Sequence, residues 1–270
     1  MKVLSKGVGL CLILGICISD VQTTEAAVTT WAFDDSGTST QTITINSAIF
    51  TTSNINSGSG TFTRMFAVDE QQTDPNNPLP SGSAQAYNDD VKNNFPFNQK
   101  TGAGFTPALT LGQLPVVTIN GTKYLQFAAA YNGGSSVSLS QFKVWMSHTA
   151  GTNITLYSQI TSNALGTKVY DLGSNQIDAS GYSSGNGTAN MFYNIPLANF
   201  AGWSLSDSVY VFARFDNITG GGYDAIAYDP NGTPLGSAPE AHTIWGGLLM
   251  GCFLIGGMLK RRLQKPIAVE

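Results

Sequence analysis

Hydrophobic and polar residues alternate with a period of two through much of the chain between residues 27 and 232. This spacing is typical of β-strands with one buried face, because successive side chains of a strand point to opposite faces of its sheet. Helical spacing is nearly absent there, so the pattern predicts an all-β fold, either an antiparallel β-sandwich or a jelly-roll-like domain. The stretches with strand signals are 41–50, 61–68, 114–131, 136–147, 153–160, 168–172, 190–195, 209–215 and 223–228.

Three local features refine this prediction. Asn120-Gly121 separates two apolar-rich arms, and both residues tolerate the positive φ of a tight hairpin turn. In 136–147 the apolar residues change parity, which predicts a β-bulge near Ser140-Gln141. Residues 209–215 are largely apolar on both faces, as expected for a central strand.

Polar stretches rich in glycine, serine and asparagine separate the expected strands. Residues 71–106 and 173–187 predict two long loops, and the first is a candidate binding region because loops often carry binding residues. Residues 223–228 are expected to close the sheet, and 229–232 to form a turn. We therefore interpret 27–232 as one β-sandwich ectodomain.

The first 26 residues have the three parts of a secretory signal. Lys2 and Lys6 give a positive start, residues 8–18 form an apolar run, and small residues lead up to Ala26. We expect a signal helix over 1–26, with cleavage after Ala26. The apolar run is short for a bilayer span, and an uncleaved anchor is the alternative.

The other end of the chain carries a second hydrophobic segment. Residues 244–259 are apolar, Trp245 lies at the expected interfacial position, and Lys260-Arg261-Arg262 follow at once. Such a basic cluster stays on the cytoplasmic side, so the sequence predicts a single transmembrane helix within 241–262 and a short cytoplasmic tail over 263–270. A buried core helix is the alternative. The ectodomain is then exported and membrane-anchored.

Residues 233–240 link the ectodomain to this anchor and end in Pro239-Glu240, followed by Ala241. A Pro-Glu motif, an apolar helix and a basic end in this order resemble the PEP-CTERM protein-sorting domain. The resemblance implies that Pro239, Glu240 and Ala241 form the sorting motif, although the family usually has a second proline where this chain has Ala241. It also implies an exosortase-type processing enzyme as partner, in bacteria that make exopolysaccharide. The sequence thus predicts a cell-surface or extracellular-matrix protein, with release from the membrane as one outcome of processing.

The strand-rich stretches LPVVTINGTKYLQFAAAY and VYVFARF resemble ectodomains that such sorted proteins carry. This kinship implies a β-sandwich and brings no active site. The charge balance adds an exclusion, because seven Lys and Arg against thirteen Asp and Glu between residues 27 and 238 give this region a net charge of −6. A surface of this sign argues against nucleic acid as a partner. The only cysteines are in the hydrophobic ends, at Cys11, Cys17 and Cys252.

Few residues of the body point to catalysis. The G-x-S-x-G match at 181–185 lacks the strand and helix that a nucleophile elbow needs. His148 is the single histidine of the body, and we expect it to cap the turn at Ala150-Gly151 rather than to ligate zinc or act in catalysis. We therefore expect a non-catalytic structural or interaction domain, with a secreted hydrolase as a weaker alternative.

Two binding hypotheses remain. Asp216, Asp224 and Asp229 offer loop oxygens that suit Ca²⁺, although turn-forming aspartates are the commoner case; no other cofactor is expected. Trp31, Trp145, Trp203 and the ten tyrosines all lie in the body and could stack on sugar rings, so a carbohydrate-binding module for exopolysaccharide is the main alternative function. For any single aromatic side chain, a place in the core is the commoner case.

Overall fold

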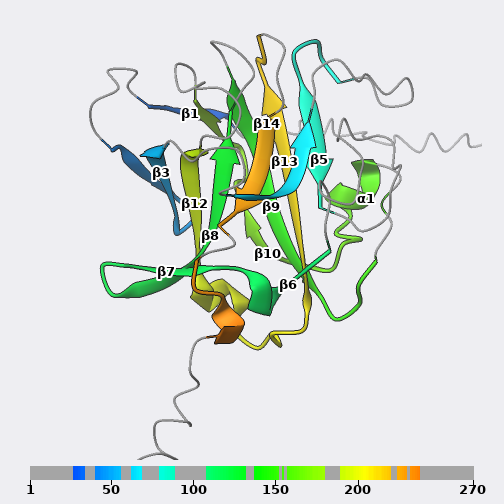
Figure 1. The fold of residues 1–270 in the computed structure, drawn as a ribbon. Coiled ribbons are helices and arrows are strands. Elements are labelled where there is room, and N and C mark those ends of the chain that lie inside the picture. Colours follow the sequence, from blue (N-terminus) through cyan, green and yellow to red (C-terminus); the bar gives the residue numbers. More distant parts are fainter. Residues whose placement is uncertain are drawn as a thin grey trace, which may run out of the picture.

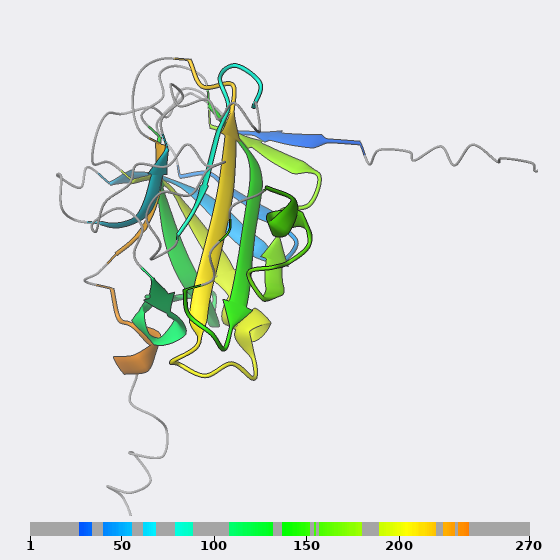
Figure 2. The same ribbon diagram turned by 90° about the vertical axis from the view of Figure 1, so that its right-hand side faces the viewer.

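The computed structural model describes residues 27–33, 40–55, 62–68, 79–88, 108–131, 137–151, 154, 157–179, 189–219, 224–229 and 232–237. Strands predominate in these residues and form two sheets of seven strands each, which lie face to face (Figure 1). Figure 2 shows the same layers from the side. The expected all-β architecture with two packed sheets is confirmed.

The first sheet has the strand order β1–β11–β9–β13–β5. Two short strands extend it, because β10 pairs with β9 and β6 pairs with β13. Its bounds are β1 (Thr29–Ala32), β5 (Ala84–Tyr87), β6 (Leu109–Thr110), β9 (Ser138–Ser147), β10 (Thr167–Asp171), β11 (Asn175–Asp178) and β13 (Ser208–Asp216).

The second sheet has the order β2–β3–β12–β8–β14–β4, with β7 paired to β8. Its bounds are β2 (Thr42–Ile45), β3 (Ala48–Ile55), β4 (Thr63–Val68), β7 (Val116–Ile119), β8 (Thr122–Ala130), β12 (Ala189–Pro196) and β14 (Asp224–Tyr228). The helices are short: η1 (Leu111–Gln113), α1 (Tyr157–Thr161), η2 (Leu197–Phe200) and η3 (Leu235–Ser237). The pairings in the described residues are antiparallel except that of β1 with β11, which is parallel and corrects the purely antiparallel prediction.

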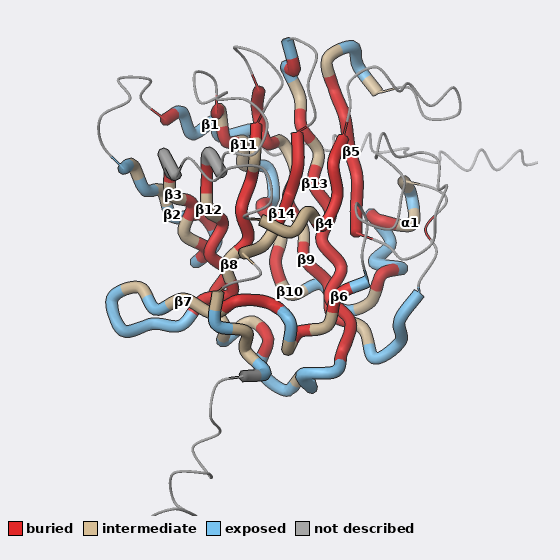
Figure 3. Tube along the Cα trace, viewed as in Figure 1, coloured by how far each residue is buried: buried red, intermediate tan, exposed pale blue. Residues whose placement is uncertain are grey.

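The main core lies between the two sheets and is rich in aromatic rings. Phe127 of β8 contacts Phe142 of β9 edge-to-face, with ring centroids 5.9 Å apart, and Phe142 meets Tyr193 of β12 at 4.9 Å. Edge-to-face pairs of this kind add stability beyond the burial of their surface. Figure 3 shows that buried residues follow the middle strands, whereas β1 is exposed along its length.

A second, smaller cluster covers part of the outer face of the first sheet. Tyr87, Trp145 and Phe212 project from that face, and Ile154 and Ile160 from the segment around α1 cover them. Strand β13 is therefore buried on both faces and lies inside its sheet, as its sequence predicts. The expected strand over 153–160 is wrong in part, because Tyr157–Thr161 form helix α1.

The local turn signals agree with the structure. Asn120 and Gly121 have φ of 49° and 80° and join β7 to β8 in the predicted hairpin. The predicted bulge lies at Ser140, because Arg214 of β13 pairs with Gln141 and the next residue, Phe215, pairs with Leu139.

Four further sequence-based assignments are corrected. Residues 41–50 form two strands rather than one, because Asn46 and Ser47 adopt φ of 49° and 69° and reverse the chain. The expected loops 71–106 and 173–187 contain strands β5 and β11. Strand β14 lies between β8 and β4 and so does not close the sheet. By contrast, the turn expected at 229–232 agrees with the structure, because the Gly232 N–H donates to the Asp229 carbonyl at 3.2 Å.

Candidate functional site

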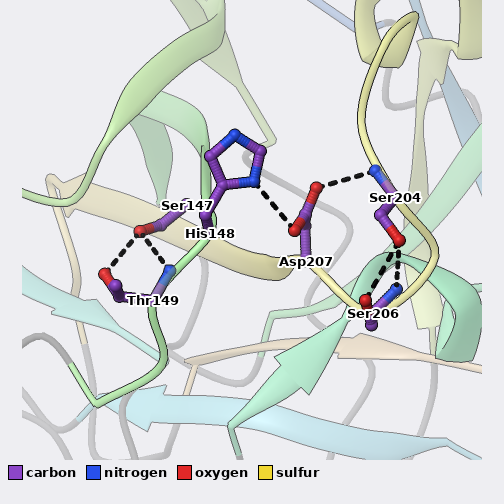
Figure 4. A network of polar contacts seen from close by, with 6 residues as sticks. All are labelled: Ser147, His148, Thr149, Ser204, Ser206 and Asp207. Atoms are coloured by element: carbon purple, nitrogen blue, oxygen red, sulfur yellow. Dashed lines mark hydrogen bonds and ion pairs between the residues drawn. The ribbon is translucent and has the colours of Figure 1, made fainter.

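A cluster of polar and aromatic side chains lies where β9 ends and β13 begins. Ser147 of β9 pairs with Ser208 of β13, so His148 and Asp207, which flank these residues, are neighbours. The Asp207 carboxylate accepts a hydrogen bond from His148 Nδ1 at 3.0 Å and another from the Ser204 backbone N–H at 2.7 Å (Figure 4). The two side chains differ in burial: Asp207 is buried, whereas His148 is 74% exposed.

The two hydrogen bonds hold the pKa of Asp207 below its usual value, with the His148 contact as the larger cause and the Ser204 N–H as the second. Asp207 is therefore a carboxylate at neutral pH, and it accepts the hydrogen of His148 Nδ1. The Nε2 atom of the neutral imidazole is then an acceptor at the exposed side of the ring. This arrangement orients an imidazole toward solvent.

The loop before Asp207 supplies an aromatic partner. The Trp203 ring lies against His148, with centroids 4.6 Å apart and planes inclined by 36°, and it is half-buried. The loop is fixed to η1 by the backbone, because the Gly112 N–H donates to the Leu205 carbonyl at 2.8 Å. Leu205 itself is 40% exposed. Trp203 and Leu205 belong to this loop, and His148 follows β9 beside it; we call these three residues together with Asp207 the His148 corner.

In the described part of the chain, no hydroxyl group completes a serine-hydrolase triad with His148 and Asp207. A serine hydrolase needs a hydroxyl within hydrogen-bond reach of the imidazole, opposite the carboxylate. Ser204 Oγ instead contacts Ser206 Oγ at 3.0 Å, and Ser147 Oγ contacts Thr149 Oγ1 at 3.1 Å (Figure 4). Among the described residues, none donates a hydroxyl hydrogen bond to His148.

The histidine did not behave as expected from sequence. We predicted that His148 caps the turn at Ala150-Gly151, but its ring reaches Asp207, 59 residues away in the chain. His148 and Asp207 meet because β9 and β13, the strands next to them, pair with each other. The sequence around either residue does not indicate that pairing. The G-x-S-x-G match at 181–185 lies outside the described residues.

The predicted calcium ligands are spread over two sheets. Asp216 ends β13 and accepts a hydrogen bond from Arg214 Nε at 3.0 Å, whereas Asp224 starts β14 in the other sheet and is buried. Asp229 follows β14. In the part of the chain that the structure describes, no three His, Cys, Asp or Glu side chains are grouped in a way that suits a metal ion. Calcium binding stays a prediction.

The predicted export and sorting residues are all outside the described ranges. This holds for the cleavage site Ala26, for the sorting motif Pro239, Glu240 and Ala241, and for the anchor residues Trp245, Lys260, Arg261 and Arg262. Within the described residues, the helices are too short and too polar to cross a membrane. The three tryptophans of the body take different places, since Trp145 is fully buried, Trp203 is half-buried and Trp31 is 38% exposed.

A scan of protein-family models, a search of curated proteins and a search of solved structures each find no match to this chain.

Proposed function

We propose that this chain is an exported bacterial surface protein whose β-sandwich serves as a non-catalytic interaction domain, held by a C-terminal helix after sorting at Pro239-Glu240. The observation that supports the proposal is the order of parts along the chain. An all-β body, described from residue 27 to residue 237, lies between a signal-like start and a tail made of motif, apolar run and basic cluster. An exosortase-type enzyme would act on the tail, and exopolysaccharide would be near the body.

The place where the chain leaves the sandwich fits an anchor that follows it. Helix η3, whose last residue is Ser237, lies at the end of the sandwich far from β1 (Figures 1 and 2). It is held there because the Leu235 N–H donates to the Leu114 carbonyl at 2.9 Å. The His148 corner belongs to the same end, through the contact of Leu205 with Gly112. An anchor that follows Ser237 would place this corner nearest the membrane and leave the opposite end for other partners.

The interaction role is favoured over hydrolysis by the geometry of the His148 corner. Its imidazole is oriented by Asp207 and backed by Trp203, but its described neighbours supply no nucleophile. Aromatic rings beside a fixed polar group are common in binding surfaces.

The test is the mass of the mature protein in its native host. Cleavage after Ala26 and near Pro239 is expected for the wild type. Changing both Pro239→Ala and Glu240→Ala is expected to leave a product that keeps residues 241–270 while still inserting into the membrane. Pro266→Ala, which changes a proline beyond the basic cluster, serves as the control and is expected to mature normally. Normal maturation of the double variant would refute sorting at this motif, and a wild-type mass that includes 241–270 would mean a plain anchor.

A further inference from the structure

Three segments that are far apart in the sequence meet at one end of the sandwich. A Cβ placed on Gly112, in η1, would lie 3.2 Å from Leu205 Cβ and 3.7 Å from Gly236 Cα, in η3. The loop that carries Leu205 and the segment that leads to Ser237 are therefore neighbours. Because the described part of the chain ends at Ser237, Leu205 lies beside the point where the chain leaves toward the predicted anchor.

The sequence of this end carries almost no charge. The stretches 111–122, 197–206 and 232–237, which include η1, η2 and η3, contain no Asp, Glu, Lys or Arg. The residues directly after the first two stretches are Lys123, which is basic, and Asp207, which is buried. The Asp207 carboxylate accepts hydrogen bonds from His148 and from the Ser204 N–H. A body of net charge −6 thus ends in a surface that has few charges to lose from water.

An apolar side chain is exposed on this surface. Within the part of the chain that the structure describes, the exposed large hydrophobic side chains are Val28, Trp31 and Leu205, at 64%, 38% and 40%. The first two belong to β1 and the residue before it, so Leu205 is the one beside the exit. Trp203 lies two residues before Leu205 and is half-buried. Indole rings are common where a protein meets the membrane interface, and leucine favours the apolar side of that interface.

The loop that presents these side chains is already held in place. The Leu205 carbonyl accepts from the Gly112 N–H at 2.8 Å, and the Asp207 carbonyl accepts from the Leu111 N–H at 2.9 Å. A surface that is fixed before binding loses little conformational freedom when it binds. The backbone of the loop is irregular, so it suits the hydrated headgroup layer of a bilayer and not the hydrocarbon.

The length of chain beyond Ser237 limits the distance between this surface and the membrane. Seven residues lead from Ser237 to Ile244, where the apolar run begins. Fully extended, they span at most about 25 Å, and the headgroup layer fills about 5–7 Å of that distance. Such a short tether gives the surface a high effective concentration at the bilayer, so a weak attraction is enough to hold it there.

We propose that the His148 corner is a lipid-contact surface, at which Trp203 and Leu205 lie in the headgroup layer of the membrane that holds the anchor. The proposal rests on the anchor proposed for 241–262 and adds a second membrane contact, made by the folded body. It places the exit end against the bilayer and β1 at the end that faces away (Figures 1 and 2).

The experiment measures how close single labelled positions lie to lipid headgroups. The chain is exported in a bacterial host, purified from its membranes with the tail kept, as its mass verifies, and reconstituted in phosphatidylcholine vesicles containing a lipid with a nitroxide on its headgroup. The native cysteines are replaced by alanine, and one new cysteine carries an environment-sensitive fluorophore. Leu205→Cys probes the corner, and Trp245→Cys probes the anchor. Both fluorophores are expected to shift to shorter wavelength in vesicles and to lose intensity with the nitroxide lipid.

Thr219→Cys is the matched control for position. Thr219 is exposed and follows the end of β13, whereas Leu205 precedes its start. The strand between them spans about 26 Å at 3.3 Å per residue, so a fluorophore at Thr219 is expected to keep its intensity.

A second pair of variants tests the lack of charge. Ala201 is exposed and lies on the same loop as Leu205. Ala201→Asp, added to Leu205→Cys, is expected to reduce the quenching, because a carboxylate resists the loss of water. Thr219→Asp adds the same charge at the other end and should leave the quenching unchanged.

The outcomes separate the contact from the anchor. Quenching at Trp245→Cys without quenching at Leu205→Cys would overturn the lipid contact and leave the anchor standing. Equal quenching at Leu205→Cys and Thr219→Cys, or quenching that Ala201→Asp does not reduce, would also overturn the contact. No quenching at either Trp245→Cys or Leu205→Cys would refute the anchor and the contact together.

Discussion

Two tyrosines in the middle of the sandwich share a hydrogen bond. The hydroxyls of Tyr131, just after β8, and Tyr193, on β12, are hydrogen-bonded to each other, and both residues are fully buried. Their rings also pack edge-to-face, Tyr131 on Phe215 at 5.9 Å and Tyr193 on Phe142 at 4.9 Å. Replacing one tyrosine by phenylalanine keeps the ring contacts and removes only the hydroxyl.

The size of the effect follows from what each change leaves behind. Tyr131→Phe leaves the Tyr193 hydroxyl buried without this bond, and Tyr193→Phe removes the same bond from the other side. A buried polar group that loses its partner costs about 1–3 kcal/mol, whereas replacing both partners by apolar groups of the same shape is nearly neutral. The free energy of unfolding should therefore fall by about 1–3 kcal/mol in Tyr131→Phe. The effects of the two substitutions should be less than additive, because both remove the same hydrogen bond.

The assay is a double-mutant cycle by urea unfolding of the purified chain, followed by circular dichroism. Each single variant should also melt lower, by roughly 2–4 °C for every kcal/mol lost in a chain of this size. Tyr157→Phe is the control, because this hydroxyl bonds Gln141 on the opposite face of the first sheet. Combined with Tyr131→Phe it should be additive, since the two sites share no partner. If the two core substitutions are also additive, the hydroxyls are satisfied independently and the reasoning is refuted.

Two further predictions concern alkaline pH and a tight turn. Burial raises the pKa of Tyr131, Tyr193 and Tyr170 above the ordinary value of 10.0. These tyrosines stay protonated in the folded state while the unfolded chain loses their protons, so the free energy of unfolding should be steady below pH 10 and fall above it. The fall is up to about 1.4 kcal/mol per pH unit for each tyrosine. Urea unfolding at a series of pH values above 10 measures this fall. A free energy of unfolding that stays level, or that falls equally steeply in the Tyr131→Phe, Tyr193→Phe double variant, would contradict the prediction. Gly166 has φ of +126°, and a Cβ there would lie 2.3 Å from the Met146 carbonyl oxygen. Gly166→Ala should thus lower the free energy of unfolding by more than the roughly 1–2 kcal/mol of a left-handed residue alone. Gly121→Ala, at φ +80° with nothing within 4 Å of the added Cβ, should lower it by only that amount. Equal melting temperatures for the two variants would show that the clash at Gly166 is relieved.

The parts of the fold that the sequence predicts correctly have local causes. The Asn120-Gly121 turn depends on two residues that accept positive φ, and the Ser140 bulge on a change of parity within one strand. Strand β13 is apolar on both sides because it packs against a cluster on each. Each of these signals is contained within about ten residues, so no knowledge of the partner strands is needed.

The elements that were missed have causes elsewhere in the chain. Residues Ala84–Tyr87 read as loop, because alanine and glutamine favour strands weakly and the surrounding sequence is rich in proline and asparagine. Pairing with β13 and the aromatic cluster around Tyr87 make this segment a buried strand. The Asn46-Ser47 turn lacks the glycine that marks most tight hairpins, so two short strands read as one.

The same reason hides the burial of Gln85, which has no exposed surface in the structure. Gln141 and Arg214 occupy polar positions of predicted strands, which sequence alone assigns to a face in contact with water, and Gln85 falls in a segment that reads as loop. Two facts about distant segments change that assignment: the register brings the three together, and the cluster around α1 covers the adjoining part of the face. A polar residue on a covered face lowers stability unless it is hydrogen-bonded. Gln85 is therefore a polar residue whose full burial the sequence does not predict. That burial becomes visible only when the pairing of the strands is known.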